Sequence, residues 1–333
     1  MSRPWLSQLL TYVSTVYGIG EKIKGAKDER KKPQILASTV FCIVLPGFLF
    51  RMESFNQLNG WMHLGRFRKL LPKGTRMPYI DAIRESLGKY ELSVLNEAHQ
   101  EIIQTARRNK VFQQGTIGGY MVVGLDGVEL FESTKKCCKH CLTRVKDGVT
   151  HYFHRAVGCM TVGSDPHVIV GMEHLHPKQD GSNKDEGELT GSKRLIQRLY
   201  KEFHHYADVI VADALFANAP FIEAVSSVHM DAVIRIKNNR LHIVKDALGL
   251  FKGRVADGGW EVKDLPPKAN RQRQRGRHLS VQMWDEEGFE MTGLNRPMRF
   301  IRFVETITET VFYGGKPKPV TVVKEVWVIT TLG

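Results

Sequence analysis

Two short apolar runs, Val122-Val-Gly-Leu-Asp126-Gly and Ala207-Asp-Val-Ile-Val-Ala-Asp213-Ala, each lead into an aspartate. Runs of about four to six residues rich in Val, Ile and Leu are typical of buried β-strands. A carboxylate at the tip of a buried strand is costly unless a cation meets it, and two adjacent carboxylates repel unless they share a proton or a metal. If the strands are neighbours, Asp126 and Asp213 provide two oxygen ligands for Mg²⁺. The alternative is that each aspartate opens a turn or caps the following helix.

The composition is that of a basic, globular protein. The 333 residues suffice for one large domain or about two to three smaller ones, and 42% hydrophobic residues argue against a disordered chain. The formal net charge of +13 favours nucleic acid as a partner over an anionic membrane surface. Five unevenly spaced cysteines argue against a secreted disulfide framework. Because the N-terminus lacks a signal-peptide core and the apolar segment 35–50 is broken by Pro46, we expect a cytoplasmic protein without a membrane span.

Residues 1–115 are predicted to form a helical, DNA-binding region. Apolar residues recur there at helical spacing, and basic stretches such as 22–32 lie between the predicted helices. Such stretches are either solvated loops or phosphate contacts, and the net charge makes phosphate contact a fair hypothesis.

The pattern changes to α/β over residues 116–239. We expect strands over 120–131, 151–162 and 167–175, a helix after Asp185, the strand that carries Asp213, a helix over 220–229 and a strand over 232–237. The order β-β-β-α-β-α-β resembles that of a ribonuclease-H-like α/β domain with a mixed sheet, in which strands one and four are neighbours. This order predicts that Asp126 lies beside Asp213. We expect a β-rich insertion over 240–325 and a strand that returns to the sheet over 326–333.

Several motifs give the chain a more specific resemblance. They are Asp126-Gly-Val-Glu-Leu-Phe, Lys136-Cys-Cys-Lys-His-Cys141, Gly148-Val-Thr-His-Tyr-Phe-His-Arg-Ala156, Lys184-Asp-Glu-Gly-Glu-Leu189, Ala212-Asp-Ala-Leu-Phe216 and Trp327-Val-Ile-Thr-Thr-Leu332. Together they resemble bacterial insertion-sequence transposases of the DDE class, in the group typified by insertion sequence 4. The resemblance covers nearly the whole chain and is weakest over 1–110.

The resemblance implies a function and a set of partners. By it, Asp126 and Asp213 match the first and second catalytic aspartates, which hold Mg²⁺ or Mn²⁺ for phosphodiester hydrolysis and strand transfer. The implied partners are double-stranded DNA, at the insertion-sequence ends and at the target, and a second copy of the chain in a synaptic complex.

The resemblance also implies a third carboxylate, a glutamate on a helix after the returning strand. The sequence ends at Gly333 without the motif that carries it, which predicts a C-terminally truncated transposase that is inactive alone. Glu186 and Glu188 are alternatives as a third ligand, although an acidic helix N-terminus is the better interpretation for both. A second function class therefore stays open, a non-catalytic DNA-binding fragment that competes with a full-length transposase.

A cysteine and histidine motif forms a second candidate site. Cys138 and Cys141 have zinc-knuckle spacing and are followed by His151 and His154, but zinc-finger histidines usually have about three to five residues between them. On a strand, residues three apart face opposite sides, so one ion shared by the two histidines is awkward unless a bulge intervenes. A reduced thiol loop is therefore favoured over a Zn²⁺ site.

A basic run, Arg271-Gln-Arg-Gln-Arg-Gly-Arg277, lies within the predicted insertion. Its four arginines, Arg271, Arg273, Arg275 and Arg277, either follow a DNA backbone or belong to a disordered loop.

Overall fold

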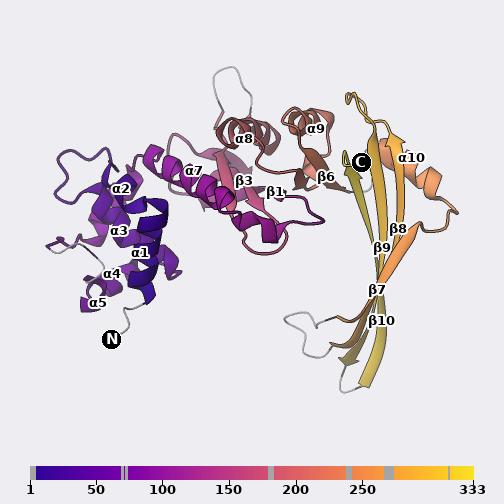
Figure 1. The fold of residues 1–333 in the computed structure, drawn as a ribbon, viewed down its shortest axis with the longest axis horizontal. Helices are drawn as coiled ribbons and strands as arrows, with labels where there is room; N and C mark the ends of the chain where they lie inside the picture. Colours follow the sequence, from indigo (N-terminus) through magenta and orange to yellow (C-terminus); the bar gives the residue numbers. More distant parts are fainter. Residues whose placement is uncertain are drawn as a thin grey trace. The chain divides into compact units, whose positions relative to one another are not determined.

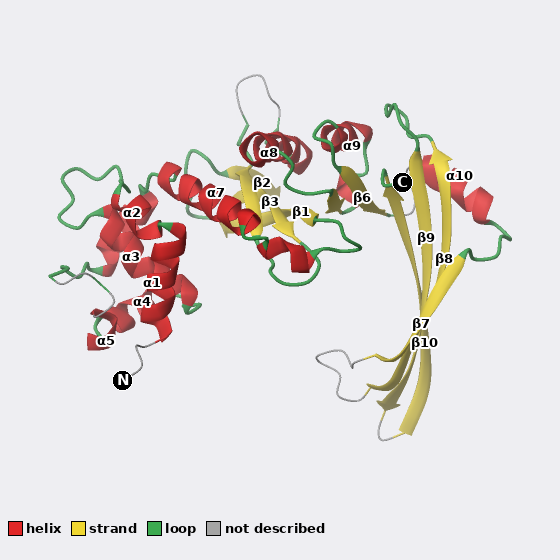
Figure 2. Cartoon of the chain, in the orientation of Figure 1, coloured by secondary structure: helices red, strands yellow, loops and turns green. Residues whose placement is uncertain are grey.

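The computed structural model of the protein describes residues 5–68, 71, 74–178, 184–237, 242–265, 274–313 and 316–333. The chain divides into two compact units, Met1–Val111 and Phe112–Gly333. Within the described residues, the first unit is built from helices and the second holds every strand of the sheet (Figures 1 and 2). Among the described residues of both units, no helix is both long enough and apolar enough to cross a bilayer.

The helical unit is organised around α3. Its helices are α1 (Trp5–Tyr17), α2 (Ile19–Lys24), α3 (Ala37–Leu49), α4 (Phe55–Met62), α5 (Gly65–Arg68), α6 (Ile80–Gly88) and α7 (Ser93–Arg108). The buried positions Val40, Ile43 and Val44 of α3 follow helical spacing. They share one apolar core with Leu58 of α4 and Ile83 of α6. The prediction that this region is helical is confirmed.

A buried ion pair fixes the connection between α2 and α3. Arg30 donates from Nε to Oδ1 of Asp28 at 2.9 Å and from Nη2 to Oδ2 at 2.6 Å. Ser86 of α6 donates its hydroxyl to the same carboxylate at 2.6 Å. The hydrogen bonds from Arg30 hold the pKa of Asp28 below its usual range, despite burial, which acts in the opposite direction.

The second unit is organised by one large mixed sheet, which follows a 3₁₀ turn, η1 (Val111–Gly115). One part of it has the order β2-β3-β1-β5-β6, with β4 also paired to β3. The first six strands are β1 (Val122–Ser133), β2 (Leu142–Lys146), β3 (Val149–Thr161), β4 (Ile169–His174), β5 (Val209–Ala212) and β6 (Asp231–Ile236). β3 runs antiparallel to β1, whereas β5 and β6 run parallel to it. The predicted neighbours, β1 and β5, are therefore confirmed as neighbours.

Two helices cover one face of these strands. α8 (Glu188–Phe203) packs on β3 and β4, and α9 (Ala219–Ser226) packs on β6. Leu195 and Leu199 of α8 are fully buried, as their helical spacing predicts. A Cβ at Gly171 of β4 would lie 2.6 Å from Cδ2 of Leu199, so glycine there is what allows α8 to approach the sheet this closely.

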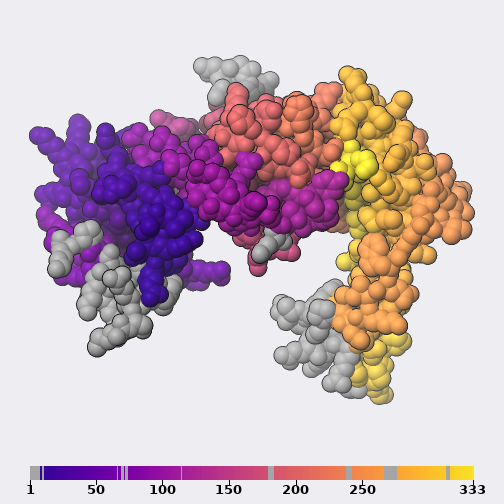
Figure 3. Space-filling view, viewed as in Figure 1, coloured from indigo at the N-terminus to yellow at the C-terminus, as the bar shows by residue number. Residues whose placement is uncertain are grey.

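The region after β6 is only partly as expected. It begins with a helix, α10 (His242–Phe251), which the expectation of a β-rich insertion omits, and continues with β7 (Gly258–Leu265), β8 (Gln274–Phe289) and β9 (Met298–Tyr313). β10 (Lys316–Thr330) is one continuous strand that crosses the expected boundary between the insertion and the returning strand at residue 326. It pairs with β9 along its whole length and with β6 over its last part. Beyond β6 the sheet continues in the order β10-β9-β8-β7, and these four strands form a long twisted ribbon (Figure 2). The same segment is coloured orange to yellow in Figure 3.

Candidate functional site

Asp126 lies at the point where β1 and β5 part. β1 continues along β3 as far as Ser133, but its parallel pairing with β5 ends at Leu125 and Ala212. Asp213 is the residue after Ala212, so the two aspartates occupy the same row at the carboxyl end of the parallel pair. Neighbouring strands lie about 4.8 Å apart. The structure thus brings the two predicted carboxylates to one position on the sheet, and both are exposed.

The two aspartates line one cavity of 510 Å³. Side chains alternate along a strand, and a Cβ at Gly127 would point at Glu188 of α8, so Asp126 points to the other face of the sheet. Gly158 of β3 is paired with Asp126 and also lines the cavity. Because a Cβ at Gly158 would meet no atom within 4 Å, the space beside the Asp126 carboxylate is open.

Each aspartate has one hydrogen bond from a nearby backbone amide. Asp126 Oδ1 accepts from the amide of Gly127 at 2.8 Å, and Asp213 Oδ1 accepts from the amide of Leu215 at 2.8 Å. Asp213 is thereby the N-cap of the 3₁₀ turn η2 (Ala214–Phe216), so the ordinary turn-opening role also applies to it. In the described part of the chain, no cationic side chain is ion-paired to either aspartate, which leaves oxygens of both for a ligand in the cavity.

Arg235 is a member of this site that the sequence analysis missed. It lies on β6, lines the same cavity, and follows the pair Ala212 and Ile234, which places it in the row beside Asp213. The signal was present in the sequence, because Arg235 stands between the buried residues Ile234 and Ile236 and must face the other side of the strand. The cavity therefore combines two carboxylates with one guanidinium.

Glu186 and Glu188 lie elsewhere. Glu188 is nearly buried and ion-paired with Arg155 at 2.5 Å, and Glu186 is ion-paired with Arg194 at 2.5 Å. Both line a different cavity, of 570 Å³, at the N-terminal end of α8. Neither lines the cavity of Asp126 and Asp213, because Glu188 lies on the opposite face of β1. Glu188 lies in the first turn of α8, as the interpretation of an acidic helix N-terminus predicts, whereas Glu186 precedes the helix.

Three of the four predicted cysteine and histidine ligands come together. Sγ of Cys138 and Sγ of Cys141 lie 3.3 Å and 3.2 Å from Nε2 of His154, and the two sulfurs lie 3.8 Å apart. His151 is the exception, because strand alternation on β3 turns it away; its Nδ1 lies 2.6 Å from Oε1 of Glu132. Burial raises the pKa of the Cys141 thiol.

The glutamate beside His151 belongs to a surface network. Hydrogen bonds from Arg144 and then from His151 hold the pKa of Glu132 below its usual range. Arg144 lies on β2, a strand that the sequence analysis does not predict.

The basic run of the ribbon is described only in part. Arg271 and Arg273 lie outside the described residues, as does the side chain of Arg275. Arg277 on β8 is buried, and its Nε donates to Oε2 of Glu309 at 3.1 Å. The prediction that Arg277 contacts a DNA backbone is therefore wrong, because its guanidinium is buried in the ribbon and ion-paired with Glu309.

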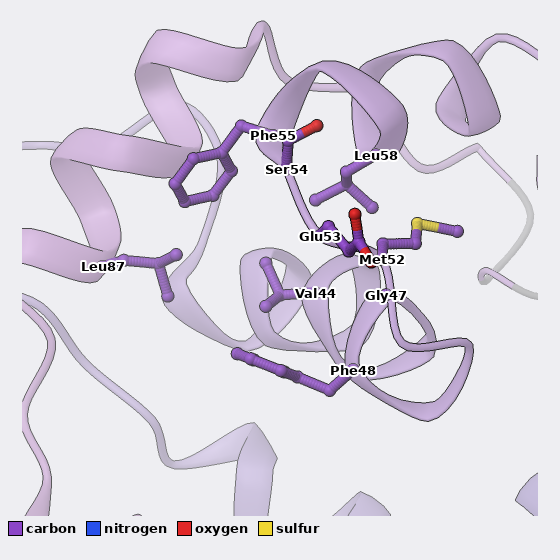
Figure 4. A pocket seen from close by; sticks show the side chains of 9 residues that line it. All are labelled: Val44, Gly47, Phe48, Met52, Glu53, Ser54, Phe55, Leu58 and Leu87. Atoms are coloured by element: carbon purple, nitrogen blue, oxygen red, sulfur yellow. The ribbon is translucent and has the colours of Figure 1, made fainter. Parts of the chain in front are cut away.

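The helical unit has a cavity of its own, of 210 Å³ (Figure 4). Its lining is mainly apolar and includes Val44, Phe48, Phe55 and Leu87. Glu53 is the one ionisable residue among those that line it. The cavity offers no set of groups for acid–base or metal chemistry.

No family model matches the sequence, and no curated protein matches it. Function is therefore inferred from the residues and their arrangement.

Proposed function

We propose that the protein is a DNA transposase of the DDE class, whose Asp126 and Asp213 hold Mg²⁺ or Mn²⁺ for phosphodiester chemistry. The observation that carries the proposal is the placement of both carboxylates in one row of parallel strands, in one cavity, without a cationic partner among the described residues. Carboxylates so placed repel each other unless a cation lies between them.

The strand order supports a ribonuclease-H-like core. The order β4-β3-β1-β5-β6, with β5 and β6 parallel to β1, is the one expected of that fold. β10 lies next to β6, as expected of a strand that returns to the sheet.

The residues of the cavity have complementary roles in this proposal. Asp126 and Asp213 provide hard oxygen ligands, and Arg235 supplies a guanidinium that suits a phosphate oxygen. Gly158 keeps the space beside Asp126 open for a bulky backbone such as that of DNA. A bound divalent ion would polarise the phosphodiester and lower the pKa of an attacking water.

A non-catalytic DNA-binding role is the second candidate, and one observation favours it. Asp126 and Asp213 are the two carboxylates among the residues that line the cavity, whereas DDE chemistry uses a third. The high positive charge fits both candidates, because it favours DNA binding with or without cleavage.

Divalent-ion binding tests the proposed metal site directly. We expect Mn²⁺ to bind the wild-type chain, as measured by electron paramagnetic resonance of the free ion. Asp126→Asn and Asp213→Asn should each weaken Mn²⁺ binding by more than about 100-fold. Removing only an outer hydrogen-bonding partner of a metal ligand typically weakens metal binding by roughly 10- to 100-fold, and the loss of a ligand itself should cost more. Asp246→Asn is the matched control, because Asp246 is exposed on α10 and the charge change is the same. Equal Mn²⁺ affinity in all four proteins would refute the site.

Nicking of a supercoiled plasmid that carries the DNA flanking the coding sequence separates the two candidate functions. Nicking by the wild type that is lost in Asp213→Asn, with DNA binding retained, supports the transposase. Mn²⁺ binding and DNA binding without nicking support the second candidate. Normal nicking by Asp213→Asn would remove Asp213 from the chemistry altogether.

A further inference from the structure

The spacing of the ligand atoms of Cys138, Cys141 and His154 is close to that of ligands around one tetrahedral ion. With zinc–sulfur bonds of about 2.3 Å and zinc–nitrogen bonds of about 2.1 Å, two sulfurs on one zinc lie about 3.8 Å apart and a sulfur and a nitrogen about 3.6 Å. The structure has 3.8 Å between the sulfurs and 3.3 Å and 3.2 Å from each sulfur to Nε2. We propose that Cys138, Cys141 and His154 bind a Zn²⁺ ion that ties the β1–β2 connection to β3.

The convergence on a single nitrogen argues against a simple hydrogen-bonded cluster. A ring nitrogen of neutral histidine has either one proton or one lone pair, so Nε2 can form one good hydrogen bond with a thiol. Two sulfurs nevertheless approach the same Nε2 and also contact each other. A cation at the centre satisfies all three atoms at once.

The backbone around the cysteines provides the donors that zinc-bound thiolates use. The amide of His140 donates to Sγ of Cys138 at 3.4 Å, and the amide of Cys138 donates to Sγ of Cys141 at 3.2 Å. The amide of Cys141 also donates to the carbonyl of Cys138 at 3.1 Å, which closes the turn. Outer hydrogen bonds of this kind hold metal ligands in place and stabilise their charge.

The site has three protein ligands and one solvent position. In the described part of the chain, no other cysteine, histidine or acidic side chain joins the three ligand atoms. Cys138 is exposed, so water reaches the cluster. Water as the fourth ligand completes a tetrahedron.

The zinc site is distinct from the proposed Mg²⁺ site. His154 and Gly158 are four residues apart on β3, a separation of about 13 Å along a strand, and Gly158 is the residue paired with Asp126. The ligand types also differ, because thiolate and imidazole select Zn²⁺ whereas carboxylates suit Mg²⁺. The Zn²⁺ proposal and the Mg²⁺ proposal therefore depend on different residues and can be tested separately.

Metal analysis of the purified full chain tests the zinc proposal. After dialysis against a weak chelator, inductively coupled plasma mass spectrometry should find about one zinc per chain in the wild type. Cys138→Ser, Cys141→Ser and His154→Asn should each lose most of it. His151→Asn and Cys137→Ser should keep it, because His151 is bound to Glu132 and Cys137 is outside the cluster. Asp126→Asn should also keep it, which separates this result from any failure of the proposed function.

Cobalt substitution keeps the test independent of folding yield. The wild-type chain loaded with Co²⁺ should show thiolate-to-cobalt charge-transfer absorption and the intense visible bands of tetrahedral cobalt, and His151→Asn should show the same spectrum. A wild-type chain that contains no zinc and gives no such spectrum overturns the proposal. So does a Cys138–Cys141 disulfide found by mass mapping of the freshly purified protein, or a zinc content that His154→Asn and His151→Asn lower equally.

Discussion

Gly127 and Asp126 are consecutive on β1 and serve opposite faces of the sheet. A Cβ at Gly127 would lie 2.3 Å from Cδ of Glu188, whose carboxylate is ion-paired with Arg155. Glycine is therefore required for α8 to bring Glu188 against β1 directly behind Asp126. Asp126 thus presents its carboxylate to the cavity, while Gly127 leaves room for α8 on the opposite face of the sheet.

The buried pair of Asp28 and Arg30 predicts a pH-dependent contribution to stability. Because the pKa of Asp28 is lowered in the folded state, its contribution is fully present above the unfolded value of about 3.9 and is lost as the pH falls through the lower folded value. We expect Asp28→Asn to destabilise the chain by about 3–5 kcal/mol at neutral pH, the usual cost of breaking a buried ion pair.

Urea unfolding of wild type and Asp28→Asn across a pH series measures this effect. The difference between them should shrink only at pH values below about 3.9. Asp81→Asn is the control, because Asp81 forms an exposed pair with Arg84 that should contribute at most about 1 kcal/mol. An Asp28→Asn effect that does not change with pH would show that the carboxylate charge is not the cause.

Packing of α8 against β4 depends on one leucine and one glycine. Leu199 is fully buried, and its Cδ2 occupies the space that a side chain at Gly171 would need. We expect Leu199→Ala to lower the free energy of unfolding by about 2–5 kcal/mol, because it leaves a cavity in the core. Leu250→Ala on α10, where the side chain is half exposed, should change it by less than about 0.5 kcal/mol. Thermal unfolding followed by circular dichroism makes the comparison, and equal effects would contradict the packing described for α8.

Local patterns were enough to predict most helices and core strands of the second unit. α8 has buried residues at helical spacing, such as Leu195, Ile196 and Leu199, and β1 begins with the buried apolar pair Val122 and Val123. β2 was missed because five residues at an edge, two of them basic, give no strand signal of their own. α10 was missed although Ile243, Val244, Ala247 and Phe251 follow helical spacing, because it is a single helix of 10 residues next to a long segment with strand-type sequence.

The candidate site was predictable to the extent that it depends on element order. The adjacency of Asp126 and Asp213 follows from the order of strands and helices, whereas the place of Arg235 beside them needs the register of β5 against β6. Strand alternation correctly separated His151 from His154. It could not show that Cys138 and Cys141 fold back onto His154, because that contact depends on the path of an irregular loop.

Positive charge is concentrated in the helical unit. Residues 1–111 contain 18 lysines and arginines against 9 aspartates and glutamates, so this third of the chain carries most of the net charge of +13. Lys27, Lys31 and Lys32 are exposed in the connection between α2 and α3. If DNA binds through this unit, these three lysines are its natural phosphate contacts.

Salt dependence of DNA binding tests which unit contacts the phosphates. We expect neutralising Lys27, Lys31 and Lys32 to glutamine to reduce the slope of log K against log salt by up to about 2.7, or about 0.9 for each phosphate that a lysine no longer neutralises. The matched control neutralises three exposed lysines of β10, Lys316, Lys318 and Lys324, which changes the net charge equally. Fluorescence anisotropy over a salt series measures both slopes. A larger change in the β10 triple variant would assign DNA binding to the ribbon instead.

β10 is a single unbroken strand that connects the ribbon to the core of the sheet. Its 15 residues pair with β9 without a register shift, whereas β8 shifts register against β9 twice. We therefore expect the β9–β10 pair to deform less easily than the β8–β9 pair. Slipping a strand by one residue would turn every side chain to the wrong face, so we expect β10 to keep its register when the ribbon bends or twists. The last part of β10 pairs with β6, where Val328 is the partner of Arg235. We therefore expect a change in the twist of the ribbon to shift Arg235, the one arginine among the residues that line the aspartate cavity.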